Sequence, residues 1–235
     1  MVRDAMDQGY KTIIMAVGSI EQHGHHLPHG TDTYLGDCLA EQFAKKLGKT
    51  LVAPTIRPGC SIHHMDFPGT ISISPETLIE LLKETCRALD HHGFENIILV
   101  PSHGGNFSPV NVAVQSIAPK LKANLIAVTD IMGLIGTFKQ KVADTGQPPE
   151  AAGGHAGAGE TSFMLVYKPE LVRKKEWRKG YIGPFTNKYV RKGFRSVTPT
   201  GVLGDPTVSS IKAGELIIEA VSDMIVDTVK RELEL

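Results

Sequence analysis

Three side chains with metal-binding chemistry lie close together near the start of the chain. Glu21 and His23 follow directly on an apolar run, and Asp32 comes after a loop rich in glycine and proline. If the chain stays extended there, Glu21 and His23 point to the same side because side chains alternate with period two. Mixed carboxylate and imidazole ligands suit zinc, manganese or iron, whereas an all-oxygen set would indicate magnesium or calcium.

Two further polar clusters follow apolar runs. Ser102-His-Gly-Gly-Asn106 comes after the run 96–101, and residues 153–162 supply His155 and Glu160. Because the carboxyl ends of parallel strands form the ligand-binding edge of an open sheet, we expect His103 to meet Glu21 and His23 there. The sequence contains no Gly-x-Ser-x-Gly elbow, no Walker motif, no Gly-x-Gly-x-x-Gly after a strand and no His-Glu-x-x-His, which disfavours the enzyme classes that use them.

The remaining histidines carry weaker signals. Of the four in the loop after Glu21, we expect at most two to touch a metal; they are His23, His25, His26 and His29. The pairs 63–64 and 91–92 are weaker candidates than His23 and His103. The second pair ends a predicted helix, where an imidazolium interacts favourably with the helix dipole.

The elements that must position these residues alternate between strands and helices. Strand-like runs occur at Thr12–Val17, Thr50–Ala53, Asn96–Pro101 and Asn124–Thr129, separated by segments with helical periodicity. This alternation predicts an α/β fold with a parallel sheet and crossover helices. The length of 235 residues favours one domain spanning 1–235.

Two helices have clear signatures. Ser74 can cap the first, Pro75 suits its first position, and Gly93 suits the residue after its end. Its predicted core face is Leu78, Leu81, Leu82, Thr85 and Leu89. For a closing helix over 210–232, the predicted core face is Ile211, Ile218, Val221, Ile225 and Val229. The long irregular stretches 54–73, 143–159 and 179–206 are typical of functional loops.

Composition excludes several classes of protein. Apolar residues make up 41% and charged residues 21%, with zero formal net charge, so no overall field attracts nucleic acid or an anionic membrane. No apolar run approaches the ~20 residues that span a bilayer, and residues 1–10 do not read as a signal peptide. We therefore expect a cytoplasmic protein. The three cysteines form no Cys-x-x-Cys pair and are expected to be structural thiols.

One stretch departs from this charge balance. Residues 168–195 contain ten basic and two acidic residues. A solvated or subunit-contacting surface explains such a stretch, and recognition of a phosphate or carboxylate on the substrate is the alternative. The aromatic residues there are irregularly spaced, which disfavours a nucleic-acid-binding module.

Taken together, these motifs resemble the creatininase (creatinine amidohydrolase) family of metal-dependent hydrolases. The matching pieces run through nearly the whole chain: residues 18–32, Phe67-Pro-Gly-Thr70, residues 102–106, residues 155–162 and an element at 201–206. The resemblance implies a three-layer α/β sandwich around a mainly parallel sheet, two divalent transition metals (Zn, Mn or Fe), and a homo-oligomer, often a hexamer.

The resemblance also implies residue roles. Glu21 and His103 correspond to ligands of one metal, His23 to a ligand of the other, and Asp32 to a carboxylate that bridges both. His155 corresponds to the catalytic histidine, which would carry a proton to the leaving nitrogen.

The candidate substrate-binding residues are Ser72, Gly104 and Asn106. Gly104 and Asn106 belong to the matching piece 102–106, and Ser72 follows shortly after Phe67-Pro-Gly-Thr70.

The chain departs from creatininase proper at two places. A glutamate ligand two residues after the metal-binding histidine is replaced by Gly105, and a Trp-Asp pair before the catalytic histidine is replaced by Ala151 and Ala152. We hypothesise that Glu160 supplies the missing ligand and acts in catalysis. The second departure makes creatinine itself a doubtful substrate.

The expected function is hydrolysis of a C–N bond in a small cyclic amide or formamide-type substrate, with a metal-bound hydroxide as nucleophile. The Gly-Gly version of the 102–106 motif also resembles relatives that deformylate a ribosylated formamidopyrimidine, open the ring of an inositol-derived ketone, or trim a peptide in cofactor maturation. Alternatives are therefore a ring-opening C–C hydrolase or related lyase, and a metal-binding protein without catalysis. No nucleic-acid or membrane partner is expected.

Overall fold

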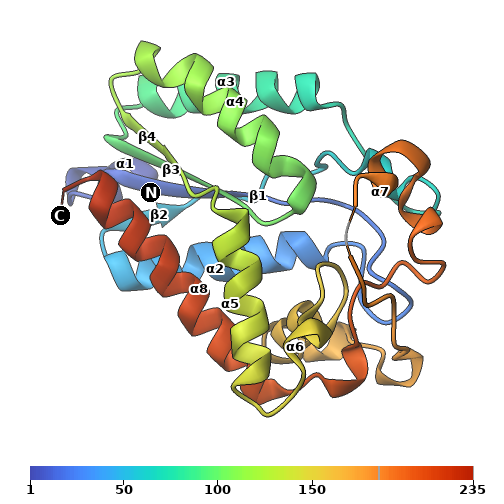
Figure 1. The fold of residues 1–235 in the computed structure, drawn as a ribbon. Helices are drawn as coiled ribbons and strands as arrows, with labels where there is room; N and C mark the ends of the chain where they lie inside the picture. The colour runs from blue at the N-terminus through green and yellow to red at the C-terminus, as the bar shows by residue number, and fades with distance from the viewer. Residues whose placement is uncertain (185, 235) are drawn as a thin grey trace.

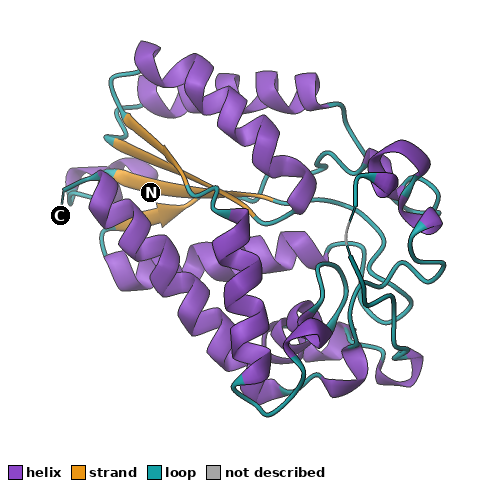
Figure 2. Cartoon of the chain, in the orientation of Figure 1, coloured by secondary structure: helices purple, strands orange, loops and turns teal. Residues whose placement is uncertain are grey.

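The structure is a computed structural model that describes residues 1–184 and 186–234. Its centre is a four-stranded parallel sheet with the order β2-β1-β3-β4 (Figure 2). The strands are β1 (Thr12–Val17), β2 (Thr50–Val52), β3 (Asn96–Pro101) and β4 (Asn124–Ala127). The parallel sheet predicted from the sequence is therefore confirmed, with β2 and β4 ending slightly earlier than expected.

Helices cover both faces of this sheet (Figure 1). The helices are α1 (Val2–Asp7), α2 (Thr31–Leu47), α3 (Pro75–His91), α4 (Phe107–Ile117), α5 (Ile131–Ala143), α6 (Ala158–Tyr167), α7 (Lys188–Lys192) and α8 (Ile211–Glu232). Helices α3 and α4 lie on one face, and α2, α5, α6 and α8 lie on the other. This is the three-layer α/β sandwich that the sequence led us to expect.

Alternate side chains of β1 pack into two hydrophobic cores, one on each face of the sheet. Ile13, Met15 and Val17 pack with α3 and α4, whereas Ile14 packs with α2 and α8. A strand that is buried on both faces has few polar side chains to spare. Functional groups must therefore come from the chain just beyond the strand ends.

The register of the two central strands brings those chain segments together. Strands β1 and β3 pair from Thr12 opposite Asn96 to Val17 opposite Pro101. Ser102 N–H still donates to the Val17 carbonyl at 3.0 Å. The segments that begin at Gly18 and Ser102 consequently leave the sheet side by side, as the sequence predicted.

Helix α3 forms where its capping signals place it. Ser74 Oγ accepts a hydrogen bond from Thr77 N–H at 3.2 Å, and Pro75 occupies the first helical position. The predicted core face is correct for Leu78 and Leu82 but wrong for Leu81, which is 41% exposed. Cys86 is buried on that face instead. Leu81 precedes the buried Leu82 and is rotated from it by about 100° around the helix axis, which turns it away from the core.

The burial pattern of helix α8 also differs in part from the predicted one. Ser210 caps it through a bond from Ala213 N–H, and Val221, Ile225 and Val229 are buried as predicted. Ile211 was expected in the core but is 56% exposed, and Ile217 is buried in its place. Ile211 is the first residue of α8, at the end of the helix.

Two further expectations concern the cysteines and membrane spans. Cys38, Cys60 and Cys86 are free and buried, as expected of structural thiols. Burial raises the pKa of Cys38 and of Cys86 to about 12, so both thiols stay neutral. Within the described part of the chain, no helix combines the length and the apolar character that a membrane crossing requires.

Truncation in α8 tests this packing. Ile217→Ala should lower the free energy of unfolding by about 2–5 kcal/mol because it leaves a cavity in the core, measured by urea denaturation. Ile211→Ala, an identical change at an exposed position of the same helix, should change it by less than about 0.5 kcal/mol. Equal losses in the two variants would contradict the burial pattern described here.

Candidate metal centre

Four residues from the sequence motifs converge at the carboxyl edge of the sheet: Glu21, His23, Asp32 and His103. His103 Nε2 lies 3.3 Å from Glu21 Oε2, and His103 Nδ1 lies 3.2 Å from Asp32 Oδ2. His23 Nε2 lies 3.3 Å from Asp32 Oδ1. All four residues are at least 95% buried. Asp32 stands at the centre of the cluster, in the first turn of α2.

Two residues from the glycine-rich segment before and within α6 complete the cluster. Glu160 Oε2 lies 3.7 Å from His23 Nε2, and His155 Nδ1 lies 3.5 Å from Glu21 Oε1. The rings of His23 and His155 have their centroids 4.2 Å apart. All six residues expected from the sequence as ligands or catalytic groups are therefore neighbours.

Main-chain carbonyls fix the orientation of three of the histidines. A carbonyl oxygen can only accept, so the ring nitrogen next to it must carry the proton. The three bonds run from His23 Nδ1 to the Glu21 carbonyl (3.2 Å), from His103 Nε2 to the Cys60 carbonyl (3.2 Å) and from His155 Nε2 to the Gln22 carbonyl (2.7 Å). In each neutral ring, the other nitrogen presents a lone pair to a carboxylate of the cluster.

A lone pair facing a carboxylate oxygen is repulsive unless a cation or a proton lies between them. Glu21 Oε1, Glu21 Oε2 and His23 Nε2 are buried and have no hydrogen-bond partner among the described residues. Anchoring the far ring nitrogen on a carbonyl is also how metal-binding histidines are held in proteins. These orphaned atoms fit divalent cations.

The donor atoms fall into overlapping sets. Within each set they lie no more than 4.8 Å apart, and two of the sets are Glu21, Asp32, His103 and His23, Asp32, Glu160. Asp32 is common to both. Carboxylate and imidazole donors in this mixture suit zinc, manganese or iron.

The charges of the cluster shift the protonation of its histidines. Burial disfavours protonation of His23, but the Asp32, Glu160 and Glu21 carboxylates outweigh it and raise the pKa to about 9. The pKa of His103 is raised well above its usual value in the same way, by Glu21 and Asp32 against burial. A metal would therefore displace protons from both rings.

His155 has the opposite behaviour. Burial, reinforced by the charge of His23, holds its pKa well below the usual value of a histidine. Its Nε2 donates to the Gln22 carbonyl, so its Nδ1 is a bare acceptor directed at the cluster. His155 is a neutral base positioned to take up a proton.

Two buried carboxylates of the cluster, Asp32 and Glu160, have pKa values shifted in opposite directions. Although burial disfavours its charge, Asp32 has a pKa lowered well below the usual value by His23 and His103. Burial raises the pKa of Glu160. The charge of His23 lowers this pKa and the charge of Asp32 raises it, and the net shift is upward. Asp32 also accepts a bond from Ser19 Oγ at 2.5 Å, which holds one carboxylate oxygen in place.

The residues expected at the substrate have different environments. Asn106 is fully buried, and its amide donates to the Val17 and Gly18 carbonyls while accepting from Cys60 N–H. The structure gives Asn106 a structural role, because a substrate contact would break one of these bonds. Ser72 Oγ accepts from Ser61 N–H at 2.8 Å and supports the loop beside His103. Gly104 lines a pocket.

His64 is the site residue that sequence reasoning undervalued. It is 1% exposed, and its Nε2 lies 3.5 Å from Glu21 Oε1. Gln22 Nε2 can only donate, so His64 Nδ1 accepts its bond at 2.8 Å and the His64 proton resides on Nε2. The position of His64 just before Phe67-Pro-Gly-Thr70 was the available signal.

The other histidines agree with the weaker interpretation. His25, His91 and His92 are exposed. His26 is buried and bonded to Thr161 Oγ1 at 3.0 Å. Of the four histidines in the loop after Glu21, only His23 belongs to the donor sets given above.

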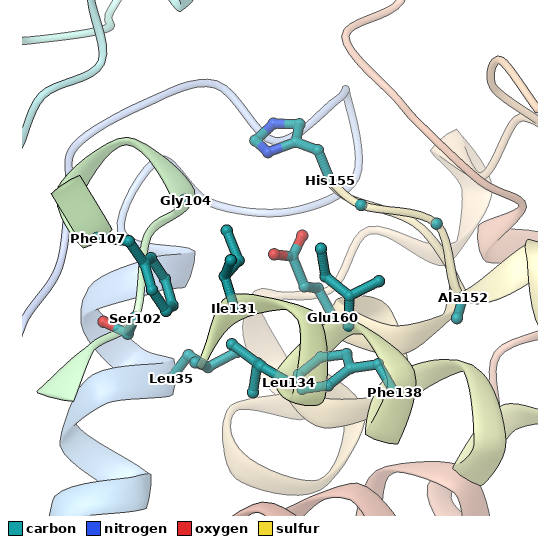
Figure 3. Close-up of a pocket in the computed structure, with 13 residues that line it drawn as sticks. Leu35, Ser102, Gly104, Phe107, Ile131, Leu134, Phe138, Ala152, His155 and Glu160 are labelled. Atoms are coloured by element: carbon teal, nitrogen blue, oxygen red, sulfur yellow. The ribbon is translucent and has the colours of Figure 1, made fainter. Parts of the chain in front are cut away.

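A pocket lies beside Glu160 and His155 of the cluster (Figure 3). Glu160 and His155 belong to its wall, together with apolar side chains from α2, α4 and α5. In Figure 3 the Glu160 carboxylate lies between His155 and these apolar side chains. Arg173 and Lys175 of the basic stretch are exposed and are not part of this wall.

Known proteins resemble this chain along most of its length. A curated protein of Mycobacterium tuberculosis named mycofactocin precursor peptide peptidase is 33% identical over 94% of this chain and 85% of its own length. A 3-dehydro-scyllo-inosose hydrolase of Thermotoga maritima is 30% identical over 94% of this chain and 78% of its own. The creatinine amidohydrolase of Pseudomonas putida is 26% identical over 94% of this chain and 89% of its own.

Solved structures confirm the architecture. A structure described as a manganese creatininase superposes with a TM-score of 0.82 and 24% identity, covering 98% of this chain and 94% of its own. The sequence profile of the family described as creatinine amidohydrolase matches residues 1–229. With its fold, its sequence and its cluster of buried carboxylates and histidines, the chain belongs to the creatininase family of hydrolases.

Proposed function

We propose that this protein is a metal-dependent hydrolase that cleaves an amide C–N bond at the buried cluster. The observation that carries the proposal is the convergence of ring nitrogens of His23, His103 and His155 on buried carboxylates at 3.2–3.7 Å. Such an arrangement must be balanced by protons or by metal cations, and a fold seldom buries so many acids for structure alone.

Two metals would be held by the overlapping donor sets. Glu21 and His103 would bind one metal, His23 and Glu160 the other, and Asp32 would bridge them. Two structures that share this fold are described as manganese and zinc-zinc forms of creatininase, which supports two divalent transition metals, with iron as a further option. When bound, such metals lower the pKa of water and polarise a carbonyl group.

The protein's own residues would handle the proton. His155 is neutral and anchored through Nε2, so Nδ1 can accept a proton from the attacking water and deliver it to the leaving nitrogen. Glu160 would take part in catalysis, since it lies 3.7 Å from His23 of the cluster and also lines the pocket. The open pocket favours catalysis over a purely structural metal site, which would be closed by protein ligands.

The names of the relatives narrow the choice of the bond type that is cleaved. One is named a peptidase and another an amidohydrolase, and both names denote hydrolysis of an amide C–N bond. We therefore favour an amide over the C–C bond of an inositol-derived ketone, although one relative is named for such a substrate. Whether the amide is a small cyclic amide, a formamide or a peptide is decided by assaying each class with and without chelator.

Gly105 supports Glu160 as the replacement ligand. A Cβ at position 105 would lie 2.2 Å from the Cys60 carbonyl oxygen and 2.6 Å from His103 Nε2. The loop that contains Cys60 therefore occupies the space where a side chain at 105 would begin. A carboxylate must reach the cluster from elsewhere, and Glu160 does so from α6.

Metal content tests the central proposal. Protein purified without chelator should carry about two transition metals per chain, measured by mass spectrometry, and Asp32→Asn should lose both because each set needs this carboxylate. Asp144→Asn, a change of the same kind at a surface ion pair with Lys141, should retain them. A wild-type chain that binds no metal even after reconstitution would overturn the proposal.

Removal of the Glu160 charge tests its role. Glu160→Gln should reduce affinity for one of the two metals by at least about 100-fold, since even supporting residues around a metal contribute 10–100-fold, and amide hydrolysis should fall with it. Glu150→Gln alters an exposed acid just before the same glycine-rich segment and serves as the control. Full metal content and activity in Glu160→Gln would show that another group completes the site.

Substitution of Gly105 tests the steric argument. Gly105→Ala should lower the free energy of unfolding by about 1–3 kcal/mol through overpacking and weaken metal binding by displacing His103. Gly104→Ala is the matched control for stability, because a Cβ there meets no atom within 4 Å. If calorimetry finds the two variants equally stable, the contact with the Cys60 carbonyl does not limit this position.

A further inference from the structure

The pocket beside the metal centre has one polar wall and one extended apolar wall (Figure 3). His155 and Glu160 form the polar side. The apolar wall consists of Leu35, Phe107, Ile131, Leu134, Ile135 and Phe138. Pockets with mainly apolar walls and a few convergent polar groups are typical of small-molecule sites.

Three residues of the apolar wall lie on α5 and keep part of their surface exposed. Ile131, Leu134 and Ile135 share one helix face because they are spaced by three and four residues, yet each is only partly buried. Met132, the residue between them on the outer face, is 72% exposed and does not line the pocket. The remaining exposure of the three residues is therefore available to a ligand.

Two glycines keep the pocket free of side chains on its other flanks. Gly104 and Gly154 both line it, and a Cβ at either position would meet no heavy atom within 4 Å. Packing against protein does not require glycine there, in contrast to Gly105. The pocket thus has room for a group larger than the reacting amide itself.

Resting on the hydrolase function proposed above, we propose that this pocket binds an apolar substituent of the substrate, aliphatic or aromatic, attached next to the scissile amide. The amide would lie between His155 and Glu160, and the substituent would extend along α5 toward Leu134 and Phe138. A compact substrate with polar groups on every side would leave this wall without a contact and desolvate its own polar groups against it.

The chemistry of the wall predicts the size of the effect. Each buried methylene contributes about fourfold in affinity. Acetohydroxamate and hexanohydroxamate are suitable probes, because both chelate a divalent metal through the same group and differ only in chain length. The metal-loaded protein is titrated with each probe by calorimetry, and hexanohydroxamate should bind at least roughly 20-fold tighter when most of its additional methylenes are buried.

Two variants of adjacent residues locate the effect. Ile131→Asn places an amide on the apolar wall and should reduce the preference for hexanohydroxamate several-fold while leaving acetohydroxamate affinity unchanged. Met132→Asn makes a comparable change on the outer face of α5 and should preserve the preference. Metal content, thermal unfolding and size-exclusion elution are measured for each protein.

The outcomes separate this inference from the function on which it rests. If neither probe binds and no metal is retained, the hydrolase proposal itself fails. If both probes bind the metal-loaded protein with equal affinity, the hydrolase proposal stands and the apolar subsite is wrong. A change of oligomeric state in Ile131→Asn without any chain-length preference in the wild type would assign the wall to a contact between copies of the chain.

Discussion

The buried negative charge of Glu21 and Asp32 is the constraint on which the rest of the structure depends. Removing a carboxylate from water costs several kcal/mol in a protein interior unless it is paired. Among the described residues, the ion-pair partners of these two acids are all histidines. A histidine offers a proton only at the expense of its lone pair, so the cluster is balanced either by protons or by metals. The same architecture can therefore fold without metal and still bind it.

Holding these groups in place requires unusual closeness of the backbone. Asn106 ties the ends of β1 and the Cys60 loop together through three hydrogen bonds. That loop then presents the Cys60 carbonyl to His103 Nε2, which directs Nδ1 toward Asp32. Because the carbonyl fills the space next to position 105, glycine there follows from the orientation of the histidine. Fixing His103 in this way excludes a second ligand side chain from position 105.

Local signals in the sequence account for much of what could be predicted. Alternation after a strand placed Glu21 and His23 on one side, and the position of His103 after a second strand placed it at the same edge, because strand ends obey simple geometry. Position on a helix is less certain: Leu81 and Ile211 fit the periodic pattern, yet both are exposed because neither faces another element of the fold closely enough to be buried. The roles of His64 and Asn106 are harder to predict, since they come from partners more than forty residues away in the sequence. The apolar pocket combines side chains of α2, α4 and α5 and is invisible until these helices are packed.

On our proposal, the transfer of a metal ligand from the β3 loop to α6 links the centre to substrate choice. With glycine at 104 and 105, the loop after β3 contributes no carboxylate to the cluster. Glu160 instead approaches from α6, on the side where the pocket opens (Figure 3). One carboxylate can then complete the second metal set and border the apolar wall. A change in the segment that supplies a ligand would thus preserve the chemistry of the metal centre while altering which groups can bind beside it. In this way one fold can accommodate substrates as different as those named for the relatives of this chain.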